Sequence, residues 1–443
     1  MTALLRRIDD QPLDATTKGV PLASGSIRLG DIGRQGWNVA RGDMMLPLLV
    51  LRDSPLRNNL EVMKRFAEHH HVSLAPHGKS SFCPQLYRDQ VEIGGSWGIT
   101  AATVQQAALV AASGISNILI ANEIVGRANV EQLVALRHAW PDAKIYHLVD
   151  SVGAMAQLST HGGALLAPGE RFQVLLEVGF PGGRAGVRKR EDGIAMVRAL
   201  AERREQFDFA GLECYEGLVS APTPEATLKE VDRLLDLAAE LYFHAYRSGA
   251  FGGREETILT AGGSAYYDRV VERFREAQSV PGTRIVLRGG SCLTYDHGFY
   301  QQHLAELDAR GGLDMPGGRV KALETFTPAL ELWAAVVSMQ DPGVAVMNMG
   351  IRDLPYDLGY PVPLRQYRDG KLLRDLRGRG QAFSVPKSND QHCYMTYPEG
   401  ADLEVGDLVA FGISHPCTAF DKWDVVYRVD DTFNITAAVK TFF

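Results

Sequence analysis

The sequence predicts an α/β fold, in which a (β/α)8 TIM barrel is followed by a C-terminal β-rich domain. Eight short apolar or β-branched runs recur in the first two thirds of the chain, and segments with helical periodicity separate them, as a barrel requires. After about residue 310 the helical periodicity fades, and short strands with turn residues between them indicate a separate β-rich domain. An open doubly wound sheet is the alternative for the first part, but about six strands would be its more usual number.

The expected strands follow one another between residues 72 and 289. They are VSLAP (72–76), WGITAA (97–102), NILIA (117–121), KIYHLV (144–149), FQVLLEV (172–178), DFAGLEC (208–214), TILTA (257–261) and RIVLRG (284–289). Amphipathic segments such as TVQQAALVAA and EDGIAMVRALAERREQ lie between them. We therefore expect a barrel domain over residues 46–310 and a β-rich domain over residues 311–443. Residues 1–45, rich in Gly and Arg, form an N-terminal segment that the pattern does not place.

Length and composition are those of a globular enzyme with more than one domain: 443 residues, of which 45% are hydrophobic and 22% charged. The formal net charge of -7 disfavours nucleic acid or an anionic membrane as a partner, because no basic field is present to collect phosphates. The N-terminus lacks an apolar signal segment and no run reaches about 18 apolar residues, so we expect a cytoplasmic protein. The five cysteines are scattered and odd in number, which favours reduced thiols over a disulfide framework.

Chemically capable residues follow several of the predicted strands, where a barrel builds its active site. Lys79 follows the first strand, Arg184 the fifth and Tyr215 the sixth. Two glycine-rich turns follow the last two strands: AGGS, with Gly262, Gly263 and Ser264, and RGGS, with Gly289, Gly290 and Ser291. Glycine lets backbone amides approach a phosphate, and the serine hydroxyls add donors. Each turn alone is weak evidence, but their position at strands seven and eight makes them candidates for a phosphate site.

Lys79 is either a lysine of a surface loop, which is the common situation, or a nucleophilic amine. Its place at the mouth of the first strand, facing a phosphate site on the last two, is the geometry needed to hold pyridoxal phosphate. A partly desolvated barrel mouth with Arg184 nearby would lower the pKa of Lys79 from the free value of about 10.4 and favour reaction with an aldehyde. We therefore expect Lys79 to carry this cofactor.

Six short motifs stand out along the chain: PHGKSSFCPQL, GSWGITAATVQQA, GGRAGV, AGGS, RGGSCLTYDHGFY and HPCTAFDKW. In this order they resemble the D-threonine aldolase and D-serine dehydratase family of fold-type III, alanine-racemase-like pyridoxal phosphate enzymes. The resemblance runs from about residue 40 to about residue 430. It implies a barrel followed by a β domain, a Schiff-base lysine at Lys79, and Arg184 and Tyr215 beside the cofactor ring. Which ring atom Arg184 contacts stays open.

His415 and Cys417 lie two residues apart in SHPCTAF, a spacing that on a strand points both side chains to one face. Imidazole and thiolate suit zinc, although from the residues alone a packed histidine and a buried free cysteine are the more common situation. In the family that the chain resembles, the matching histidine and the residue two later bind a divalent metal beside the substrate's β-hydroxyl. Its dehydratases have cysteine at the second position, whereas its aldolases tend to have aspartate. The resemblance thus implies zinc, or another divalent metal, at His415 and Cys417, and an elimination reaction.

The expected function is a pyridoxal phosphate and zinc dependent dehydratase that converts a D-β-hydroxy amino acid, such as D-serine or D-threonine, to a 2-oxo acid and ammonia. The alternatives are retro-aldol cleavage to glycine and an aldehyde, a racemase or decarboxylase reaction, and a non-enzymatic pyridoxal phosphate carrier. Such carriers typically lack the β domain that this chain is expected to have. The expected partners are a small D-amino acid substrate and a second copy of the chain in a homodimer, with neither nucleic acid nor membrane.

Overall fold

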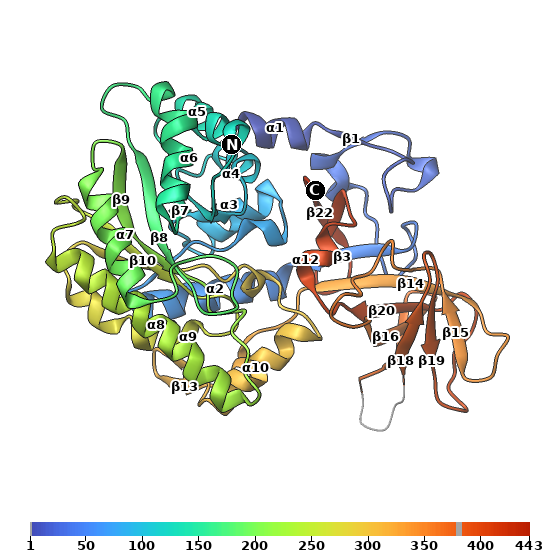
Figure 1. Cartoon of the computed structure of the whole chain (residues 1–443). Coiled ribbons are helices and arrows are strands. Elements are labelled where there is room, and N and C mark those ends of the chain that lie inside the picture. The colour runs from blue at the N-terminus through green and yellow to red at the C-terminus, as the bar shows by residue number, and fades with distance from the viewer. Residues whose placement is uncertain (1, 378–382) are drawn as a thin grey trace.

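A parallel barrel forms the first large part of the molecule (Figure 1), in a computed structural model that describes residues 2–377 and 383–443. Its strands follow the order β4-β11-β10-β9-β8-β7-β6-β5. They are β4 (Ser73–Leu74), β5 (Ile99–Ala101), β6 (Asn117–Glu123), β7 (Lys144–Val149), β8 (Phe172–Val178), β9 (Phe207–Cys214), β10 (Thr257–Ala261) and β11 (Thr283–Leu287). The strands at the two ends of this order, β4 and β5, lie next to each other: the amide of Trp97, just before β5, donates to the Leu74 carbonyl of β4 at 2.8 Å. Each strand overlaps one expected from the sequence, so the predicted (β/α)8 barrel is confirmed.

Helices cover the outside of the barrel, between successive strands. They are α2 (Asp53–His69), α3 (Pro84–Glu92), α4 (Val104–Ala112), α5 (Arg127–Ala139), α6 (Val152–Gly162), α7 (Arg190–Glu202), α8 (Pro224–Arg247) and α9 (Tyr267–Arg273). Thr103, Ser151 and Thr223 each precede a helix and accept a hydrogen bond from the amide three residues on, which defines where α4, α6 and α8 begin. Among the described residues, no helix combines the length and the apolar composition needed to cross a membrane.

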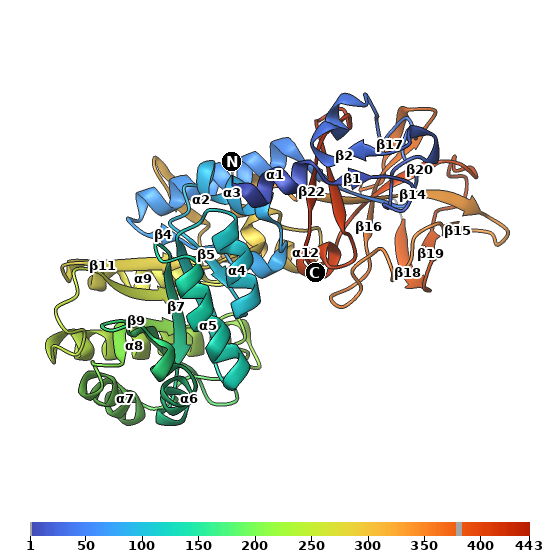
Figure 2. The ribbon, with the colours of Figure 1, turned by 90° about the horizontal axis from the view of Figure 1, so that it is seen from above.

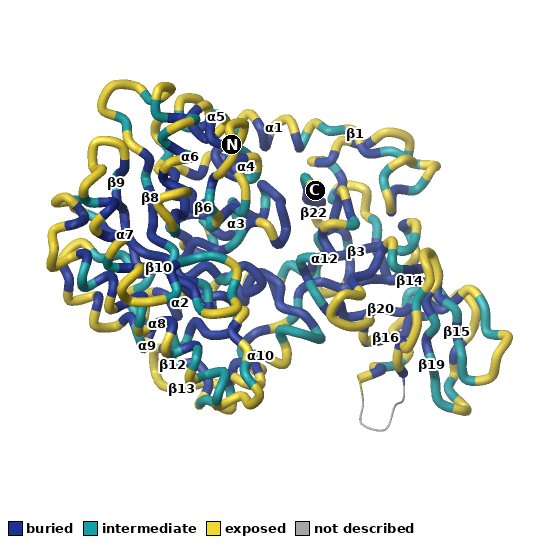
Figure 3. The backbone as a smooth tube through the Cα atoms, viewed as in Figure 1, coloured by how far each residue is buried: buried dark blue, intermediate teal, exposed yellow. Residues whose placement is uncertain are grey.

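Most residues of the barrel strands are buried, as the dark blue stretches of the tube show (Figure 3). Along β6, Leu119 lies in the apolar cluster inside the barrel, whereas its neighbours Ile118 and Ile120 belong to the cluster between the sheet and the helices. Successive side chains of a strand point to opposite faces, so a strand covered on both sides is a continuous apolar run. This is why the eight strands are visible in the sequence.

The second domain is rich in β-strands, as predicted. It contains β14 (Leu330–Ser338), β15 (Val344–Met347), β16 (Val362–Arg368), β17 (Lys371–Asp375), β18 (Ser384–Ser388), β19 (Cys393–Thr396), β20 (Leu408–Gly412), the short helix α12 (Pro416–Phe420), β21 (Val425–Val429) and β22 (Ile435–Lys440). The long strand β14 joins two parts of the sheet, because it pairs with β20 before a bulge between Val336 and Ser338 and with β15 around and after that bulge.

The N-terminal segment lies against this second domain (Figure 2). It contains α1 (Ala3–Asp9), β1 (Pro12–Leu13) and β2 (Ile27–Arg28), and it leads into β3 (Leu48–Arg52). The Asn38 side chain donates to Asn434 Oδ1 at 2.9 Å. β3 is antiparallel to β14 and parallel to β21, so it is a strand of the second domain. The range 46–310 expected for the barrel therefore starts too early, because the partners of β3 are distant in sequence and no local pattern reveals them.

The other expected boundary, at residue 310, also falls within structure that belongs to the barrel side. Between the barrel and β14 lie α10 (Phe299–Ala309), β12 (Leu313–Met315), β13 (Gly318–Val320) and α11 (Ala322–Thr325). Leu313, Met315 and Ala322 are buried in the cluster that surrounds the barrel. The barrel unit thus continues to about residue 326.

Candidate active site

A cavity of about 500 Å³ opens at the carboxyl ends of the barrel strands, a volume typical of small-molecule sites. It is lined by every residue predicted for the site except Gly289: Lys79, Arg184, Tyr215, Gly262, Gly263, Ser264, Gly290, Ser291, His415 and Cys417. Gly289 lies just behind the wall, where a Cβ would be 3.0 Å from the Cys292 Sγ. The structure therefore brings together residues from the barrel and from α12 of the second domain.

Lys79 lies in a single 3-10 turn, Gly78–Ser80, directly after β4. The Tyr87 hydroxyl donates to the Gly78 carbonyl at 3.0 Å and ties this turn to α3. Lys79 is exposed at the rim of the barrel, and its side chain lines the cavity. Burial lowers the pKa of its ammonium, Arg184 and Arg288 lower it further, and Cys417 opposes them. The amine is therefore more readily deprotonated than a free lysine, which suits a nucleophile or a base.

The AGGS turn binds a carboxylate of the protein itself. Glu216, which is fully buried, accepts hydrogen bonds from the amides of Gly262 at 3.1 Å and Gly263 at 2.7 Å. These two amides, expected to bind a phosphate, are occupied, because each N–H has one proton to donate. Within the described ranges, the amides of Ser264, Gly289 and Gly290 donate to no protein acceptor. The free donors for a phosphate thus lie on Ser264 and the RGGS turn.

Gly290 has a structural reason to be glycine. A Cβ at this position would lie 2.5 Å from the His77 carbonyl oxygen and 2.9 Å from the Ser80 Oγ, so the backbone would have to move. Glycine lets the RGGS turn approach the Lys79 turn this closely. At Gly263 a Cβ would be 3.0 Å from the ring of Tyr215. Both glycines therefore shape the cavity wall, whatever they contribute to a phosphate.

Arg184 and Tyr215 form one side of the cavity. The Arg184 guanidinium lies over the Tyr215 ring, 5.3 Å from its centroid, which is a cation–π arrangement. Burial raises the pKa of the Tyr215 phenol, as does the charge of Glu216, so the phenol keeps its proton near neutral pH. Both residues line the cavity, and the expectation that they contact a cofactor ring stays a prediction.

His415 and Cys417 differ from the expectation in their secondary structure. They do not lie on a strand: Pro416 begins the short helix α12, His415 is its N-cap residue and Cys417 lies in its first turn. Both side chains nevertheless line the same cavity. The Cys417 Sγ is 3.3 Å from the Ser80 Oγ, which places it beside the Lys79 turn.

Asp357 holds the His415 ring. Its Oδ2 accepts a hydrogen bond from the His415 Nδ1 at 2.6 Å, and its Oδ1 accepts one from the Thr418 hydroxyl at 2.6 Å. The Nε2 of His415 is then the nitrogen left for a ligand, as in carboxylate–histidine–metal arrangements. Burial alone would raise the pKa of the Cys417 thiol, but its hydrogen bonds with the side chains of His415 and Ser80 and the charge on His415 lower that pKa. An imidazole and a thiol that ionises readily are donors that fit zinc.

His415 and Cys417 together would supply two ligands to a metal ion. Water or substrate would fill its remaining coordination positions. In the part of the chain that the structure describes, a single group of three metal-binding side chains is found, namely His69, His70 and Asp314. It lies before β4, at the opposite end of the barrel strands, and the His70 Nε2 is bonded to the Asp314 carbonyl at 2.9 Å. That group is therefore separate from the cavity.

Sequence reasoning missed the carboxylates at the bottom of the cavity. Glu123, Glu177 and Glu213 line it from the ends of β6, β8 and β9. The signal that could have found two of them is a Glu one residue before the end of each of the mainly apolar runs FQVLLEV and DFAGLEC. A carboxylate near the carboxyl end of a fully buried barrel strand points either into the site or into the core, and a core position is costly.

Arg288, at the end of β11, was also missed, although it precedes a predicted turn. Its side chain is buried and forms an ion pair with Glu213. It also donates to the Thr260 Oγ1 at 2.9 Å and to the Cys214 carbonyl at 3.0 Å. These bonds hold the charge of Arg288 beneath the cavity rather than at its mouth.

Two family models match the chain. The alanine racemase N-terminal domain covers residues 53–267, and the putative serine dehydratase domain covers residues 329–429. The first match lies in the barrel and the second in the β-rich domain that carries His415 and Cys417.

Curated relatives extend over nearly the whole chain. It is 34% identical over 401 residues to a D-threonine aldolase of an Arthrobacter species, covering 88% of this chain and 92% of the relative. It is 25% identical over 405 residues to a 3-hydroxy-D-aspartate aldolase of Paracoccus denitrificans, covering 90% and 94%.

Solved structures share the fold. A D-threonine aldolase from Filomicrobium marinum has a TM-score of 0.70 at 24% identity, covering 92% of this chain and 97% of that one. A D-threo-3-hydroxyaspartate dehydratase from Delftia sp. HT23 has a TM-score of 0.67 at 20% identity, covering 89% and 97%. A cysteine-to-alanine variant of a D-threo-3-hydroxyaspartate dehydratase is described as the metal-free form.

Proposed function

Because this chain belongs to the D-threonine aldolase and D-serine dehydratase family of fold-type III pyridoxal phosphate enzymes, we propose that it is a lyase that converts a D-β-hydroxy amino acid to a 2-oxo acid and ammonia. The choice of dehydration depends on one observation, the Cys417 thiol that lies beside His415 and faces the Lys79 turn. D-Serine and D-threonine are the substrates proposed.

The cavity fits pyridoxal phosphate. Lys79 offers an amine of lowered pKa at the mouth, and the free amides of Ser264, Gly289 and Gly290 are donors for a phosphate. The half-buried ring of Tyr215 offers a flat wall. When bound, the cofactor supplies an electron sink that stabilises negative charge on the α-carbon of an amino acid.

A divalent metal such as zinc fits the other side of the cavity. His415, through Nε2, and Cys417, through Sγ, would hold it, with a position left open. A zinc ion there would supply a Lewis acid that helps a hydroxyl group to leave.

Different side chains of the cavity would then have different roles in the reaction. Lys79 is suited to take the α-proton, since a lowered pKa leaves more of its amine neutral near neutral pH. Asp357 keeps the His415 ring in one orientation, and Ser80 links Cys417 to the Lys79 turn. A substrate between these groups would have its α-hydrogen toward Lys79 and its β-hydroxyl toward His415 and Cys417. Loss of the α-proton and of the β-hydroxyl group as water gives an enamine. Its imine tautomer is then hydrolysed to the 2-oxo acid and ammonia.

The products formed from D-threonine test this proposal. The protein loaded with pyridoxal phosphate and zinc should release 2-oxobutanoate and ammonia, and a chelator should stop the reaction until zinc is restored. Cys417→Ala and His415→Ala should each retain the bound cofactor yet lose ammonia release, because the two groups use separate parts of the cavity. Ammonia release that survives rigorous metal removal would refute the metal site.

Retro-aldol cleavage is the second candidate, and the 34% identity to a D-threonine aldolase favours it. The same cavity could serve both reactions, because each begins with a β-hydroxy amino acid held between an amine and a metal. Glycine and acetaldehyde as the main products from D-threonine would select the aldolase and reject the dehydratase.

A further inference from the structure

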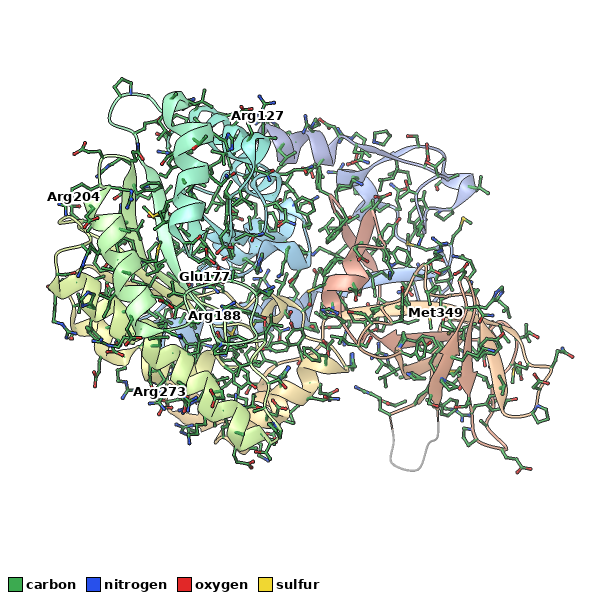
Figure 4. The ribbon with its side chains drawn as sticks, viewed as in Figure 1. Arg127, Glu177, Arg188, Arg204, Arg273 and Met349 are labelled. Atoms are coloured by element: carbon green, nitrogen blue, oxygen red, sulfur yellow. The ribbon has the colours of Figure 1, made fainter. Side chains whose placement is uncertain are left out.

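Three carboxyl groups face the bottom of the cavity from strands β6, β8 and β9. Glu177 and Glu213 are paired in register on the parallel strands β8 and β9, so their side chains point the same way. Glu123 reaches the same cavity from the end of β6. Figure 4 shows Glu177 near the end of β8. Such a group is unusual, because three ionised carboxylates in one partly buried space repel one another.

The arginines near Glu123 and Glu177 interact with other groups. Arg288 forms its ion pair with Glu213, and Arg184 lies over the Tyr215 ring. Arg188, labelled near Glu177 in Figure 4, donates to the carbonyls of Gly183 and Ala185. Within residues 2–377 and 383–443, neither Glu123 nor Glu177 has a Lys or Arg ion-pair partner.

Two buried oxygens in this group need a hydrogen-bond donor. Among the residues that the structure describes, the buried Glu123 Oε1 and Glu213 Oε2 have no hydrogen-bond partner. A carboxylate oxygen can only accept, so a protonated carboxyl beside it is the simplest donor that satisfies it. Glu177 lies within hydrogen-bonding reach of Glu123. Burial, followed by the charges of Glu213, Glu123 and Asp150, raises the pKa of Glu177 to about 10, and burial raises that of Glu213 to about 7.

We propose that Glu177 keeps its proton at neutral pH and shares it with Glu123, and that this neutral acid lets an anionic cofactor bind next to Glu213. The second half of this inference depends on the proposed function, whereas the first half does not. Glu177 is in this sense a positioning residue, since it adjusts the charge of the cavity rather than reacting.

The charged and titratable groups facing Glu177 come from each surrounding element. They are Glu123 on β6, Asp150 after β7, Glu213 on β9, Arg184 in the loop after β8, and Arg288 at the end of β11. Arg288 is paired with Glu213, so the proton on Glu177 limits the negative charge in this part of the cavity. Ionisation of Glu177 as the pH rises would add a further negative charge, and the affinity for an anion should fall.

Infrared difference spectroscopy on the full chain tests the proton directly. The spectrum of the wild type minus that of Glu177→Gln at pH 7.5 should contain the carbonyl stretch of a protonated carboxyl, with and without added cofactor. A carboxylate band in its place would overturn the inference. If Glu177→Gln does not fold, Glu123→Gln replaces it: removing the Glu123 charge should lower the pH at which the protonated band disappears, and an unchanged pH would overturn the inference.

Two further measurements separate this role from a merely structural one. The affinity of the wild type for pyridoxal phosphate should fall about tenfold between pH 8 and pH 10.5, while that of Glu177→Gln stays flat. Glu177→Gln should also be more heat stable than the wild type at pH 8, with a difference that shrinks toward pH 5, because an unfolded Glu177 ionises in that range and a folded one does not. The exposed-helix variant Glu131→Gln should match the wild type in both.

The outcomes distinguish the two proposals. Parallel pH curves for the wild type and Glu177→Gln would reject the role of Glu177 in cofactor binding. A wild type that binds no pyridoxal phosphate at any pH would reject the proposed function and the cofactor half of this inference, while the infrared spectrum would still decide whether the proton is there.

Discussion

Replacing Asp357 by alanine should weaken zinc binding at His415 and Cys417 by about 10- to 100-fold. Asp357 accepts hydrogen bonds from the His415 Nδ1 and the Thr418 hydroxyl, each at 2.6 Å. A hydrogen bond to a charged group contributes about 1.5–3 kcal/mol. The Asp357 side chain is 40% exposed, so solvent screens part of this, and a loss of about 1.4–2.7 kcal/mol corresponds to the stated range.

Competition with a colorimetric zinc chelator measures this change. Asp357→Asn keeps an acceptor oxygen but loses the charge, so its zinc affinity should lie between those of the wild type and Asp357→Ala. Asp421→Asn is the matched control, because Asp421 senses the charge of His415 yet its partner in the structure is Lys422. Equal zinc affinity in the wild type and Asp357→Ala would refute the reasoning, as would an equal loss in Asp421→Asn.

Three other substitutions test the remaining parts of the site. Lys79→Ala should leave the circular dichroism unchanged and abolish the covalent cofactor link, so borohydride treatment and peptide mapping should find no labelled lysine; a label on another lysine would contradict the assignment. Gly290→Ala should lower the melting temperature, because its Cβ would meet a backbone carbonyl at 2.5 Å, whereas Gly163→Ala, where nothing lies within 4 Å, should not. Arg288→Met should cost about 3–5 kcal/mol of unfolding free energy at pH 8 by leaving Glu213 buried without its cation. The cost should be smaller in urea titrations at pH 5, below the pKa of about 7 to which burial raises Glu213, and a cost independent of pH would contradict this.

The barrel was predictable because its strands are short, buried on both faces and separated by helices with their own signals. The run NILIA, for example, alternates between the inner and outer apolar clusters, so every residue in it is constrained. Lys79 and the glycine turns could be predicted as cavity residues for the same reason, since a barrel places all strand ends at one rim.

What could not be predicted depends on contacts between distant segments. The occupation of the Gly262 and Gly263 amides requires Glu216 from a different loop, and no pattern within AGGS reveals it. The helical start at Pro416 was missed because a His-x-Cys spacing is compatible with a strand or with a helix N-terminus. The hydrogen bond from His415 to Asp357 likewise depends on how a loop is placed beside α12.

The pairing of β3 ties segments from before and after the barrel into one sheet. β3 is synthesised before the barrel, yet it lies between β14 and β21, which are both synthesised after the barrel. The apolar strand LLVLR must therefore stay unpaired while the whole barrel folds behind it, a state prone to aggregation and suited to chaperone binding. A fragment that starts at residue 329 would lack this strand and expose the edge of β14. Cys417 of the second domain thus depends on a sheet that joins segments from before and after the barrel, so a chain that lacks β3 should not place this thiol beside the Lys79 turn.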